Sequence, residues 1–539
     1  MKFKRILLTL FLQLCFSSII WGQYYSKLDL DASYQWNPRY QISEKEAGAG
    51  EAYLVNLKEG RGEIRFFRWG QPTVDPIFGA AVIVMERDGD WETRTFLNTK
   101  GLPSKGQEGI VSWRIRYNKE GFPIQLFKYD RHGNLLGDHL GIGVYAWIPD
   151  EGGRRKRSIR LDSTGQRRPD RNGVWEVILE YDAASRPIQQ TFLNERGRAA
   201  PNRLGVTQIK VEYNKQGDVI RQTNWNAQNE VVEDVRGIHK LVWEYDTAGN
   251  VTQLSFFDSE GQPWYDHKGV SRYLWQRSVE GRWTREIHYD IQGQITLDDE
   301  GIAVIRHHWL GQNNEKETRN FGLAINPFFM SLSPELQDKE ERYRLKSDLQ
   351  GVAIYRWTFD SDGNVLETKF FDEDLNFTPD HNGVMVYRRT FNSLGLPLQE
   401  SYYANYSQPV ENFDGIHQVQ WEYDPHGLLV AKHNLGLDGR PRPDSMGVNS
   451  YQWVSDEKGK LTLQTHLGDF GQWKEDLYGV ARYRWTYDKL GRVIEQTNFG
   501  IDDRPTEDDS GVYVYKWTYG ADGRQILTEK LDKNGRSRP

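Results

Sequence analysis

Residues 479–500 have the sequence GVARYRWTYDKLGRVIEQTNFG, and copies of this stretch make up most of the chain. Its aromatic residues, such as Tyr483 and Trp485, alternate with charged or polar residues, and this period of two predicts a strand with one apolar face. Asp488 to Gly491 have the chemistry of a tight turn, because an Asx side chain bonds nearby backbone and glycine accepts a positive φ. With a second strand over Arg492 to Phe499, the stretch predicts a β-hairpin.

Copies of this hairpin recur at a fixed spacing. Unit glycines fall every 32 residues from Gly109 to Gly301 and again from Gly351 to Gly511, and two divergent units begin near Gly50 and Gly79. A period of this size is the signature of a repeat array in which each unit buries surface against its neighbours. We therefore predict an all-β fold of tandem antiparallel β-hairpin repeats over residues 50–321 and 348–539.

Most units share a turn and an aromatic position. The predicted structural turns pair an Asp with a Gly three residues later, as in Asp246 and Gly249, Asp424 and Gly427, and Asp488 and Gly491. The sixth residue after a unit glycine is usually Trp, which gives an aromatic ladder of Trp243, Trp275, Trp357, Trp421, Trp453, Trp485 and Trp517. Strict repetition along one face favours a buried core for this ladder. The alternative is a glycan-binding face, because aromatic rings stack on sugars.

So many strands cannot form a flat ribbon. Neighbouring strands rotate by about 20–25° on average. We expect one long twisted or coiled sheet, a superhelix or open shell with its aromatic face turned inward, since large apolar patches rarely stay exposed. The alternative is an elongated rod with both faces wet.

The first 22 residues have the pattern of a signal peptide. A basic start, with Lys2, Lys4 and Arg5, precedes an apolar run from Ile6 to Ile20, and Gly22 is a small residue suited to cleavage. The run is too short for a membrane span, so no membrane insertion is expected after signal removal. Residues 23–49 carry no period and are predicted to be an N-terminal lead-in or cap.

The leader predicts a secreted or periplasmic protein. The alternative is a surface lipoprotein anchored through Cys15, which the bulky Leu14 before it disfavours. Cys15 is the only cysteine, so the mature chain is expected to form no disulfide and no thiolate metal site. The net charge of −7 becomes −10 once the three leader cations are removed, and no basic block is present. Nucleic acid is therefore not an expected partner.

The period breaks once, between Gly301 and Gly351, where 18 extra residues are inserted. The strand register continues to Phe321, so the extra residues are assigned to an enlarged connector at 322–347. Ser333 followed by Pro334 predicts the start of a short helix within it. Insertions in repeat arrays often serve binding, and the candidate binding residues are Phe328, Phe329, Arg342, Tyr343 and Arg344. The alternative is a tolerated surface insertion.

No catalytic residue, metal site or cofactor is predicted. Asp360 to Asn364 resembles the start of a calcium loop, but Phe371 stands where a bidentate acid is needed. His307 and His308 are adjacent, which points them to opposite faces of a strand. No HExxH, Walker-type or GxSxG motif occurs, and acids are too numerous for a glycosidase pair to be identified.

The stretch TYDKLGRVIEQTNFG, residues 486–500, resembles the YD repeats of RHS and teneurin-like surface proteins. Partial matches occur at Tyr245-Asp246, Tyr423-Asp424 and Phe359-Asp360, and the resemblance covers the first hairpin of most units. The chain departs from these proteins in its 32-residue period and its second, turn-rich connector. The resemblance implies a spiralling β-hairpin sheet in an exported or surface protein. No C-terminal toxin effector is expected, because the last unit stops at Pro539.

These observations predict a non-catalytic exported repeat scaffold that mediates protein or glycan interaction at or outside the cell envelope. The alternative is a secreted carbohydrate-active or other hydrolytic enzyme with a site inside the coiled sheet.

Overall fold

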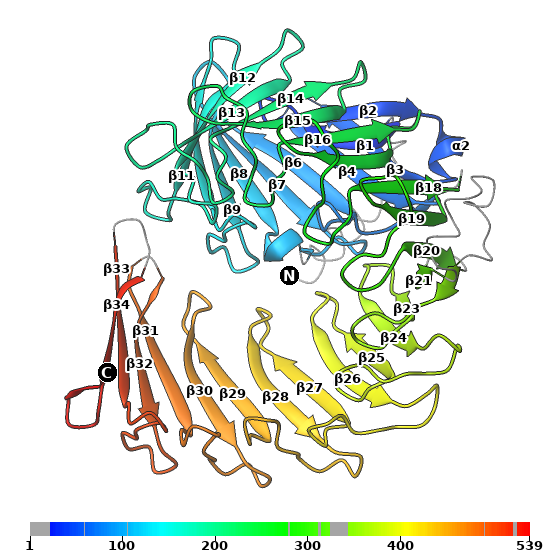
Figure 1. The fold of residues 1–539 in the computed structure, drawn as a ribbon. Coiled ribbons are helices and arrows are strands. Elements are labelled where there is room, and N and C mark those ends of the chain that lie inside the picture. Colours follow the sequence, from blue (N-terminus) through cyan, green and yellow to red (C-terminus); the bar gives the residue numbers. More distant parts are fainter. Residues whose placement is uncertain are drawn as a thin grey trace, which may run out of the picture.

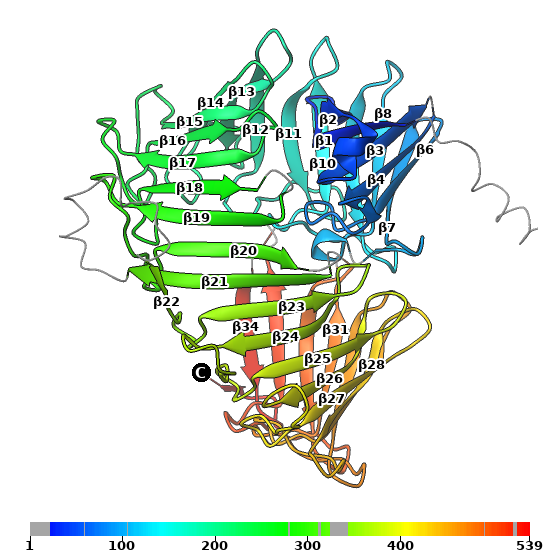
Figure 2. The same cartoon turned by 90° about the vertical axis from the view of Figure 1, so that its right-hand side faces the viewer.

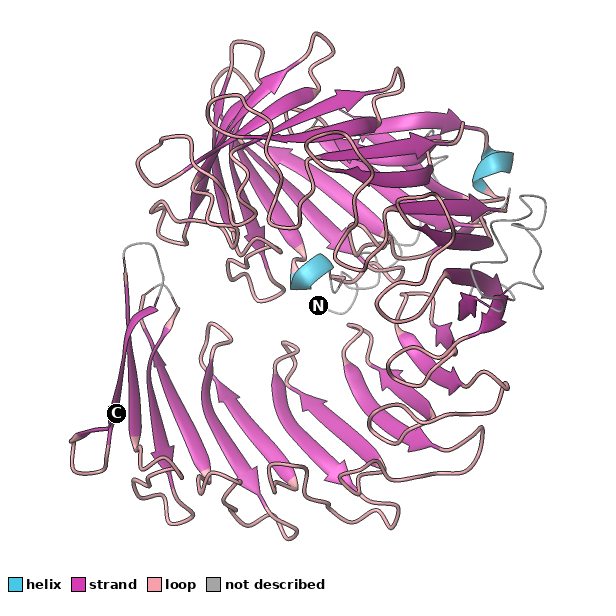
Figure 3. Ribbon diagram, viewed as in Figure 1, coloured by secondary structure: helices cyan, strands magenta, loops and turns pink. Residues whose placement is uncertain are grey.

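The computed structural model describes residues 22–58, 60–104, 106–278, 281–310, 314–323, 343–489, 491–520 and 525–538. Almost all of the predicted signal peptide lies outside these residues, as do the helix predicted after Ser333 and the candidates Phe328, Phe329 and Arg342. The described chain is all-β, with thirty-five antiparallel strands in one long open sheet (Figure 3). The predicted fold class is confirmed.

The N-terminal part of the sheet departs from the regular repeat. It comprises the helix α2 (Glu44–Ala47), the 3-10 turn η2 (Gln107–Gly109) and the strands β1 (Gln23–Leu30), β2 (Trp36–Ile42), β3 (Glu51–Lys58), β4 (Arg61–Arg68), β5 (Gln71–Pro72), β6 (Val82–Asp88) and β7 (Trp91–Leu97).

Regular hairpins follow from β8 onward, each made of two consecutive strands. In chain order they are β8 (Ser112–Tyr117), β9 (Pro123–Tyr129), β10 (Val144–Pro149), β11 (Arg155–Leu161), β12 (Glu176–Tyr181), β13 (Pro187–Leu193), β14 (Gln208–Tyr213), β15 (Val219–Trp225), β16 (Lys240–Tyr245), β17 (Val251–Phe257), β18 (Arg272–Arg277) and β19 (Trp283–Tyr289). The series continues with β20 (Val304–Leu310), β21 (Glu315–Leu323), β22 (Tyr343–Leu345), β23 (Ile354–Phe359), β24 (Val365–Phe371), β25 (Val386–Phe391), β26 (Pro397–Tyr403), β27 (Gln418–Tyr423) and β28 (Leu429–Leu435). It ends with β29 (Ser450–Ser455), β30 (Leu461–Leu467), β31 (Arg482–Tyr487), β32 (Val493–Phe499), β33 (Val514–Tyr519), β34 (Gln525–Leu531) and the short β35 (Ser537–Arg538).

The hairpin turns have the predicted chemistry. In the turn after β16, Oδ1 of Asp246 accepts the backbone N–H groups of Ala248 (2.9 Å) and Asn250 (2.8 Å), and Gly249 has φ 82°. The same carboxylate pattern occurs at Asp424, with Gly427 at φ 81°. Asp488 accepts the N–H of Arg492 (2.9 Å), and Gly491 has φ 78°. Because these bonds are local, every unit can form its turn without help from distant residues.

A second Asp fixes the junction between units. Oδ1 of Asp476 accepts the N–H groups of Tyr478 and Val480 (both 3.0 Å), while its Oδ2 accepts the hydroxyl of Tyr483 (2.7 Å). Val480 and the next residue, Ala481, are completely buried beneath this junction. The carboxylate thus joins the connector to the first strand of the following unit.

The sheet winds past one full turn, so distant parts of the chain stack on each other. We call β3 to β18 the first coil and β19 to β34 the second coil; Figures 1 and 2 show them as two tiers, blue to green and green to red. Oδ1 of Asp362 accepts the N–H of Thr99 (2.9 Å), and the Lys458 carbonyl accepts Nδ2 of Asn134 (2.6 Å). The paired residues are 263 and 324 positions apart in sequence. Connector turns of the first coil therefore meet hairpin turns of the second.

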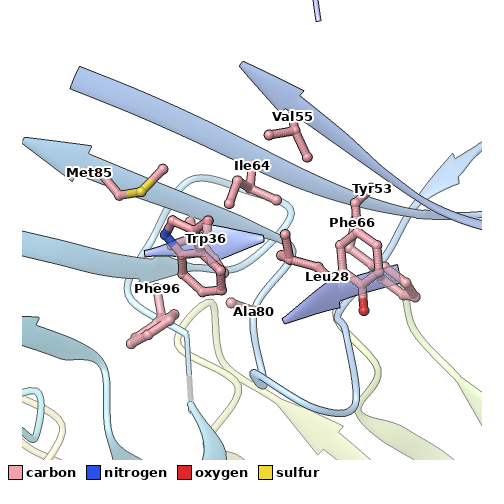
Figure 4. Close-up of a cluster of buried hydrophobic side chains, with 10 residues drawn as sticks. Leu28, Trp36, Tyr53, Val55, Ile64, Phe66, Ala80, Met85 and Phe96 are labelled. Atoms are coloured by element: carbon pink, nitrogen blue, oxygen red, sulfur yellow. The ribbon is translucent and has the colours of Figure 1, made fainter. Parts of the chain in front are cut away.

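The hairpin β1–β2 folds over the aromatic face of the first coil. It remains part of the sheet, since β1 pairs with β3. Trp36, 7 % exposed, packs with Ile64, Met85 and Phe96 in the core cluster drawn in Figure 4. At the hairpin tip, the Tyr34 ring lies 4.8 Å from the ring of Trp147 and 5.6 Å from that of Trp113. The aromatic face is therefore the face that the chain's own N-terminal hairpin covers at this end of the sheet.

The inserted segment begins and ends differently from the prediction. β21 runs through Gly322 to Leu323, and β22 pairs with it, Tyr343 opposite Leu323 and Arg344 opposite Gly322. The same strand pairs with β23 through its earlier residues, 315–319. The connector predicted for 322–347 is therefore wrong at both ends, because β21 extends beyond β23 and its free edge is paired by β22.

Candidate functional site

The aromatic ladder of the second coil consists of paired rings. In the units that begin at Gly351, Gly447, Gly479 and Gly511, the Tyr four residues after the unit glycine lies beside the Trp two residues later, on the same face of the strand. The two rings are nearly parallel in three consecutive units: Tyr451–Trp453 (centroids 5.5 Å apart, 4° between planes), Tyr483–Trp485 (5.9 Å, 27°) and Tyr515–Trp517 (6.1 Å, 11°). The repeat thus places the same aromatic pair at regular intervals along the coil.

Each ring is held in place through its polar end. Nε1 of Trp485 donates to Oε1 of Gln496 across the hairpin (3.0 Å), and Trp453 does the same to Gln464 (2.9 Å). The Tyr483 hydroxyl donates to Asp476, and burial together with this carboxylate raises the pKa of Tyr483 far above its usual value. The Tyr483 hydroxyl therefore stays neutral and bonded to Asp476, and the face of its ring is the part left to contact a ligand.

The ladder is not the buried core that its repetition suggested. Trp243, Trp275, Trp357, Trp421, Trp453, Trp485 and Trp517 are all half-buried. Trp147, at the same position in the first coil, is only 4 % exposed. A single-layer sheet offers no second layer to cover its concave face, and β1–β2 covers it only near its own tip. Trp147 is therefore buried under the hairpin, whereas the other ladder residues are half-buried, and two of them, Trp275 and Trp421, pack against buried side chains of neighbouring strands.

A pocket of about 440 Å³ lies on this face between the units that begin at Gly479 and Gly511. Its aromatic lining consists of Tyr478, Tyr483, Trp485, Tyr515 and Trp517, and Gln464 and Gln496 supply amides. Asp508, Asp509 and Ser510 enter from the next junction. Among the described residues, none that lines it is a Lys or Arg. The ladder residues were predictable from the repeat, whereas Gln464 and Gln496 were not among the predicted site residues; their only signal is the cross-strand position opposite Trp453 and Trp485.

The described candidates from the insertion do not form a binding site together. Tyr343 is 9 % exposed and packs against Ile287 and Val304, with the Arg285 guanidinium 4.9 Å from its ring centroid. Arg344, its neighbour, is exposed. Tyr343 is therefore a core residue that anchors β22.

The Asp-rich turn at 360–364 serves to connect the coils. Asp360 accepts the N–H groups of Asp362 (2.9 Å) and Asn364 (2.8 Å), and Asp362 pairs with Lys100 of the first coil (3.0 Å). Within the described part of the chain, no group of three or more His, Cys, Asp or Glu side chains is arranged to hold a metal ion.

The adjacent histidines have separate environments. Nδ1 of His307 lies 2.8 Å from Oγ1 of Thr318, and burial, with the nearby Lys316 cation, lowers the pKa of His307 to about 4. His308 is exposed. No helix among the described residues is long and apolar enough to span a bilayer.

Comparison with known proteins gives only distant similarity. No family model matches the chain, and no curated protein matches its sequence. Its structure is similar to crystal structures of TcdB2-TccC3-Cdc42 (TM-score 0.28, 12 % identity, covering 94 % of this chain and 28 % of that one) and TcdB2-TccC3-TEV (0.26, 12 %, 95 % and 26 %). A Tc holotoxin pore from Photorhabdus luminescens gives 0.23 and 11 %, covering 90 % and 26 %. The chain thus spans little more than a quarter of the length of these structures.

Proposed function

We propose that this chain is a non-catalytic exported repeat scaffold that binds a protein or glycan partner at or outside the cell envelope. The partner binds the concave aromatic face of the second coil. The observation that carries this proposal is the unequal use of one face: the chain covers its aromatic ladder at Trp147, under the tip of β1–β2, and leaves the rest of the ladder half-buried, including all of it in the second coil.

The exposed ladder is prepared for binding. Tyr and Trp supply large contact areas, and both rings of the Tyr451–Trp453 and Tyr483–Trp485 pairs are fixed by hydrogen bonds before any ligand arrives. Ordering a flexible side chain on binding costs about 0.5–1.5 kcal/mol. Rings such as those of Tyr483 and Trp485 avoid most of that cost, which favours recognition over a purely structural role.

Glu286, an acid on this face, is already engaged in hydrogen bonds, which supports binding rather than catalysis. Glu286 accepts Nε1 of Trp275 (2.7 Å) and lies 3.0 Å from Nε2 of His288. Burial raises the pKa of Glu286, but these hydrogen bonds outweigh burial and hold the pKa below its usual value. A carboxyl group that acts as a general acid needs the opposite shift.

Export rests on the leader, and its test is direct. The basic start and apolar run of residues 1–22 are expected to direct secretion. Expression with the native leader, followed by N-terminal sequencing of the exported protein, should give Gln23 as the first residue. An uncleaved chain in the cytoplasm would contradict the proposal.

The binding face is tested by capture. The mature chain, immobilised, is exposed to envelope fractions and to a glycan array, beside a variant carrying Trp485→Ala and Trp517→Ala. The matched control is Trp225→Ala, because Trp225 is also half-buried but pairs with Gln208 on the opposite face, under the Lys210 ammonium. We expect the double variant to lose capture and the control to keep it. Glycan turnover that disappears on replacing one carboxylate would overturn the non-catalytic proposal.

A further inference from the structure

We infer that the pocket between the units beginning at Gly479 and Gly511 is one subsite of a groove for a neutral glycan chain. This inference rests on the proposed function and names the ligand of the same face. Four features of the structure support it: the chemistry of the pocket lining, the charge of that lining, the contrast with the residues around β1–β2 in the first coil, and the repeat spacing.

The pocket lining combines aromatic hydrocarbon with paired donors and acceptors. Oε1 of Gln496 has two lone pairs, of which Nε1 of Trp485 uses one, and its Nε2 donates one hydrogen to Asn498 (3.1 Å). One acceptor and one donor position are left on the amide. A sugar hydroxyl needs both at once, while the C–H faces of a sugar ring pack on aromatic rings. The Gln496 amide can therefore bind a sugar hydroxyl while the Trp485 ring packs against the C–H face of the same sugar.

The second glutamine repeats this arrangement. Oε1 of Gln464 accepts Nε1 of Trp453, and its Nε2 lies 2.7 Å from Nε2 of the buried His466. Gln464 belongs to the preceding unit, yet it lines the same pocket. The groove thus continues from one unit into the next.

The charge of the pocket lining favours a neutral glycan over an acidic one. Asp508 and Asp509 line the pocket, and no described lining residue is cationic. The Asp508 carboxylate is occupied by the Tyr515 hydroxyl (2.6 Å) and by local N–H groups, whereas Asp509 is exposed. Uronic acids and sulfated sugars would meet these carboxylates without a compensating cation, which is unfavourable at short range.

In the first coil this face is covered by a peptide segment, the hairpin β1–β2, and the residues that hold it show what a peptide ligand requires. There the tip of β1–β2 places Tyr34 and Trp36 on the ladder, and the Arg94 guanidinium lies 5.1 Å from the Trp36 ring centroid. Arg94 also donates to the carbonyl of Tyr34 (2.8 Å), and Arg155 lies over the Tyr34 ring at 5.1 Å. The pocket in the second coil has amides and carboxylates in place of such cations. This difference favours a glycan over an aromatic peptide.

The spacing of the ladder suits an extended polymer. Trp453, Trp485 and Trp517 occupy the same position in consecutive units, two strands apart, which is about 9.6 Å at about 4.8 Å per strand. This distance is close to the length of a disaccharide in an extended chain. The chain would run across the strands, with about two sugar rings for each repeat.

The test uses the full mature chain and four probes in a calorimetric titration. The probes are a neutral β-linked gluco-oligosaccharide of six sugars, its disaccharide, an oligogalacturonate of six sugars, and a peptide with the sequence of residues 32–41. We expect the neutral hexasaccharide to bind best and the disaccharide more weakly. Trp485→Ala should weaken binding by about tenfold or more, as expected for an aromatic residue central to a site. Trp485→Phe should retain part of it, Gln496→Leu should weaken it less than Trp485→Ala, and Trp225→Ala should leave it unchanged.

Several outcomes would overturn the inference. They are tighter binding of the oligogalacturonate or the peptide, equal binding by Trp485→Ala, or no binding of any oligosaccharide. If a protein partner is captured through Trp485 while no oligosaccharide binds, this inference fails and the proposed function stands. If no partner depends on Trp485 and Trp517, both fail. Thermal melting of each variant separates loss of binding from loss of folding.

Discussion

The part of the ladder that lies under the tip of β1–β2 and the part that is left open use the same aromatic positions for different ends. Trp147 in the first coil is nearly fully buried, with the Tyr34 ring 4.8 Å away. Trp485 in the second coil is half-buried and bonds to Gln496. The strands, turns and junctions around them are alike. A strand pattern that looks like a core therefore becomes one only if another layer of chain reaches it.

The comparison also shows what holds the second coil together without that layer. Asp or Asn side chains close most of the described hairpin turns, as at Asp488 and Asn392, and each junction Asp binds two backbone N–H groups of its own connector. Stacking of the coils adds bonds such as Asp362 to Thr99. The fold thus depends on polar contacts repeated in every unit, which leaves the aromatic face free for another role.

The largest expected effect comes from removing the layer over the first coil. Trp36→Ala should lower the free energy of unfolding by about 3–5 kcal/mol, because a large buried side chain is replaced by a cavity. Chemical denaturation followed by circular dichroism measures this loss. A loss no greater than that of Trp485→Ala would contradict the difference in burial between the coils.

A junction variant should have the next largest effect. Asp476→Asn removes the charged acceptor of the Tyr483 hydroxyl and should cost about 1–3 kcal/mol. The matched control is Asn412→Asp, since position 419, the equivalent of Tyr483, is Val and offers no hydroxyl. We expect the control to change stability by less than about 0.5 kcal/mol. A double-mutant cycle with Tyr483→Phe should be non-additive; additive losses would show that the two side chains are not coupled.

Acid should detach β1–β2 before the second coil unfolds. Asp218 binds Lys27 (2.6 Å) and Arg39 (2.9 Å) of that hairpin. Burial raises the pKa of Asp218, but the hydrogen bonds from Lys27, Tyr40 and Asn214 outweigh burial and lower the pKa to about 2. A depressed carboxyl pKa contributes stability above its unfolded value, near 3.9, and this stability is lost as pH falls toward about 2.

Hydrogen exchange of residues 27–40 between about pH 4 and 2 measures this step. Asp218→Asn should give the same faster exchange at neutral pH. Unchanged protection of the hairpin across that pH range would show that Asp218 does not hold it.

The smallest effect on stability is expected from the open ladder itself. Trp485→Ala should lower the free energy of unfolding by about 1 kcal/mol, because the ring is half-exposed and its loss leaves no closed cavity. Thermal melting of this variant beside Trp36→Ala makes the comparison within one protein. A loss as large as that of Trp36→Ala would place the ladder of the second coil in a core.

Much of the fold was predictable because its determinants are close in sequence. The bonds from Asp246 and Asp424 reach residues two and four positions away, and the period of 32 fixed the number and order of the hairpins. The ends of the insertion were mispredicted, because pairing of Tyr343 with Leu323 depends on an edge left free by β23. The candidate pocket was only half-predictable: its aromatic residues stand out as a ladder, whereas Gln496 becomes part of it only through the hairpin register.

The residue at each junction between units can be compared with the fourth residue of the unit that follows. Asp stands at every junction whose following unit has Tyr at the fourth position, as at Asp138 and Asp508, which accept the hydroxyls of Tyr145 and Tyr515. Asn replaces it at positions 202 and 412, where the fourth residue is Ile209 or Val419 and no hydroxyl needs an acceptor. A Tyr at the fourth position is thus always preceded by a junction Asp, whereas Asp also occurs without it at Asp170, Asp234 and Asp298, where the residue seven positions later is Val177, Leu241 or Ile305.

The sequence by itself determined the strands, the turns and the repeat, since each rests on contacts within one unit or between neighbours. Only the tertiary structure decided which part of the ladder is core. That outcome depends on β1–β2 folding over the first coil and on coils that meet across separations of 263 to 324 residues. Such contacts carry no periodic signal, because the side chains that cover Trp147 come from outside the repeat.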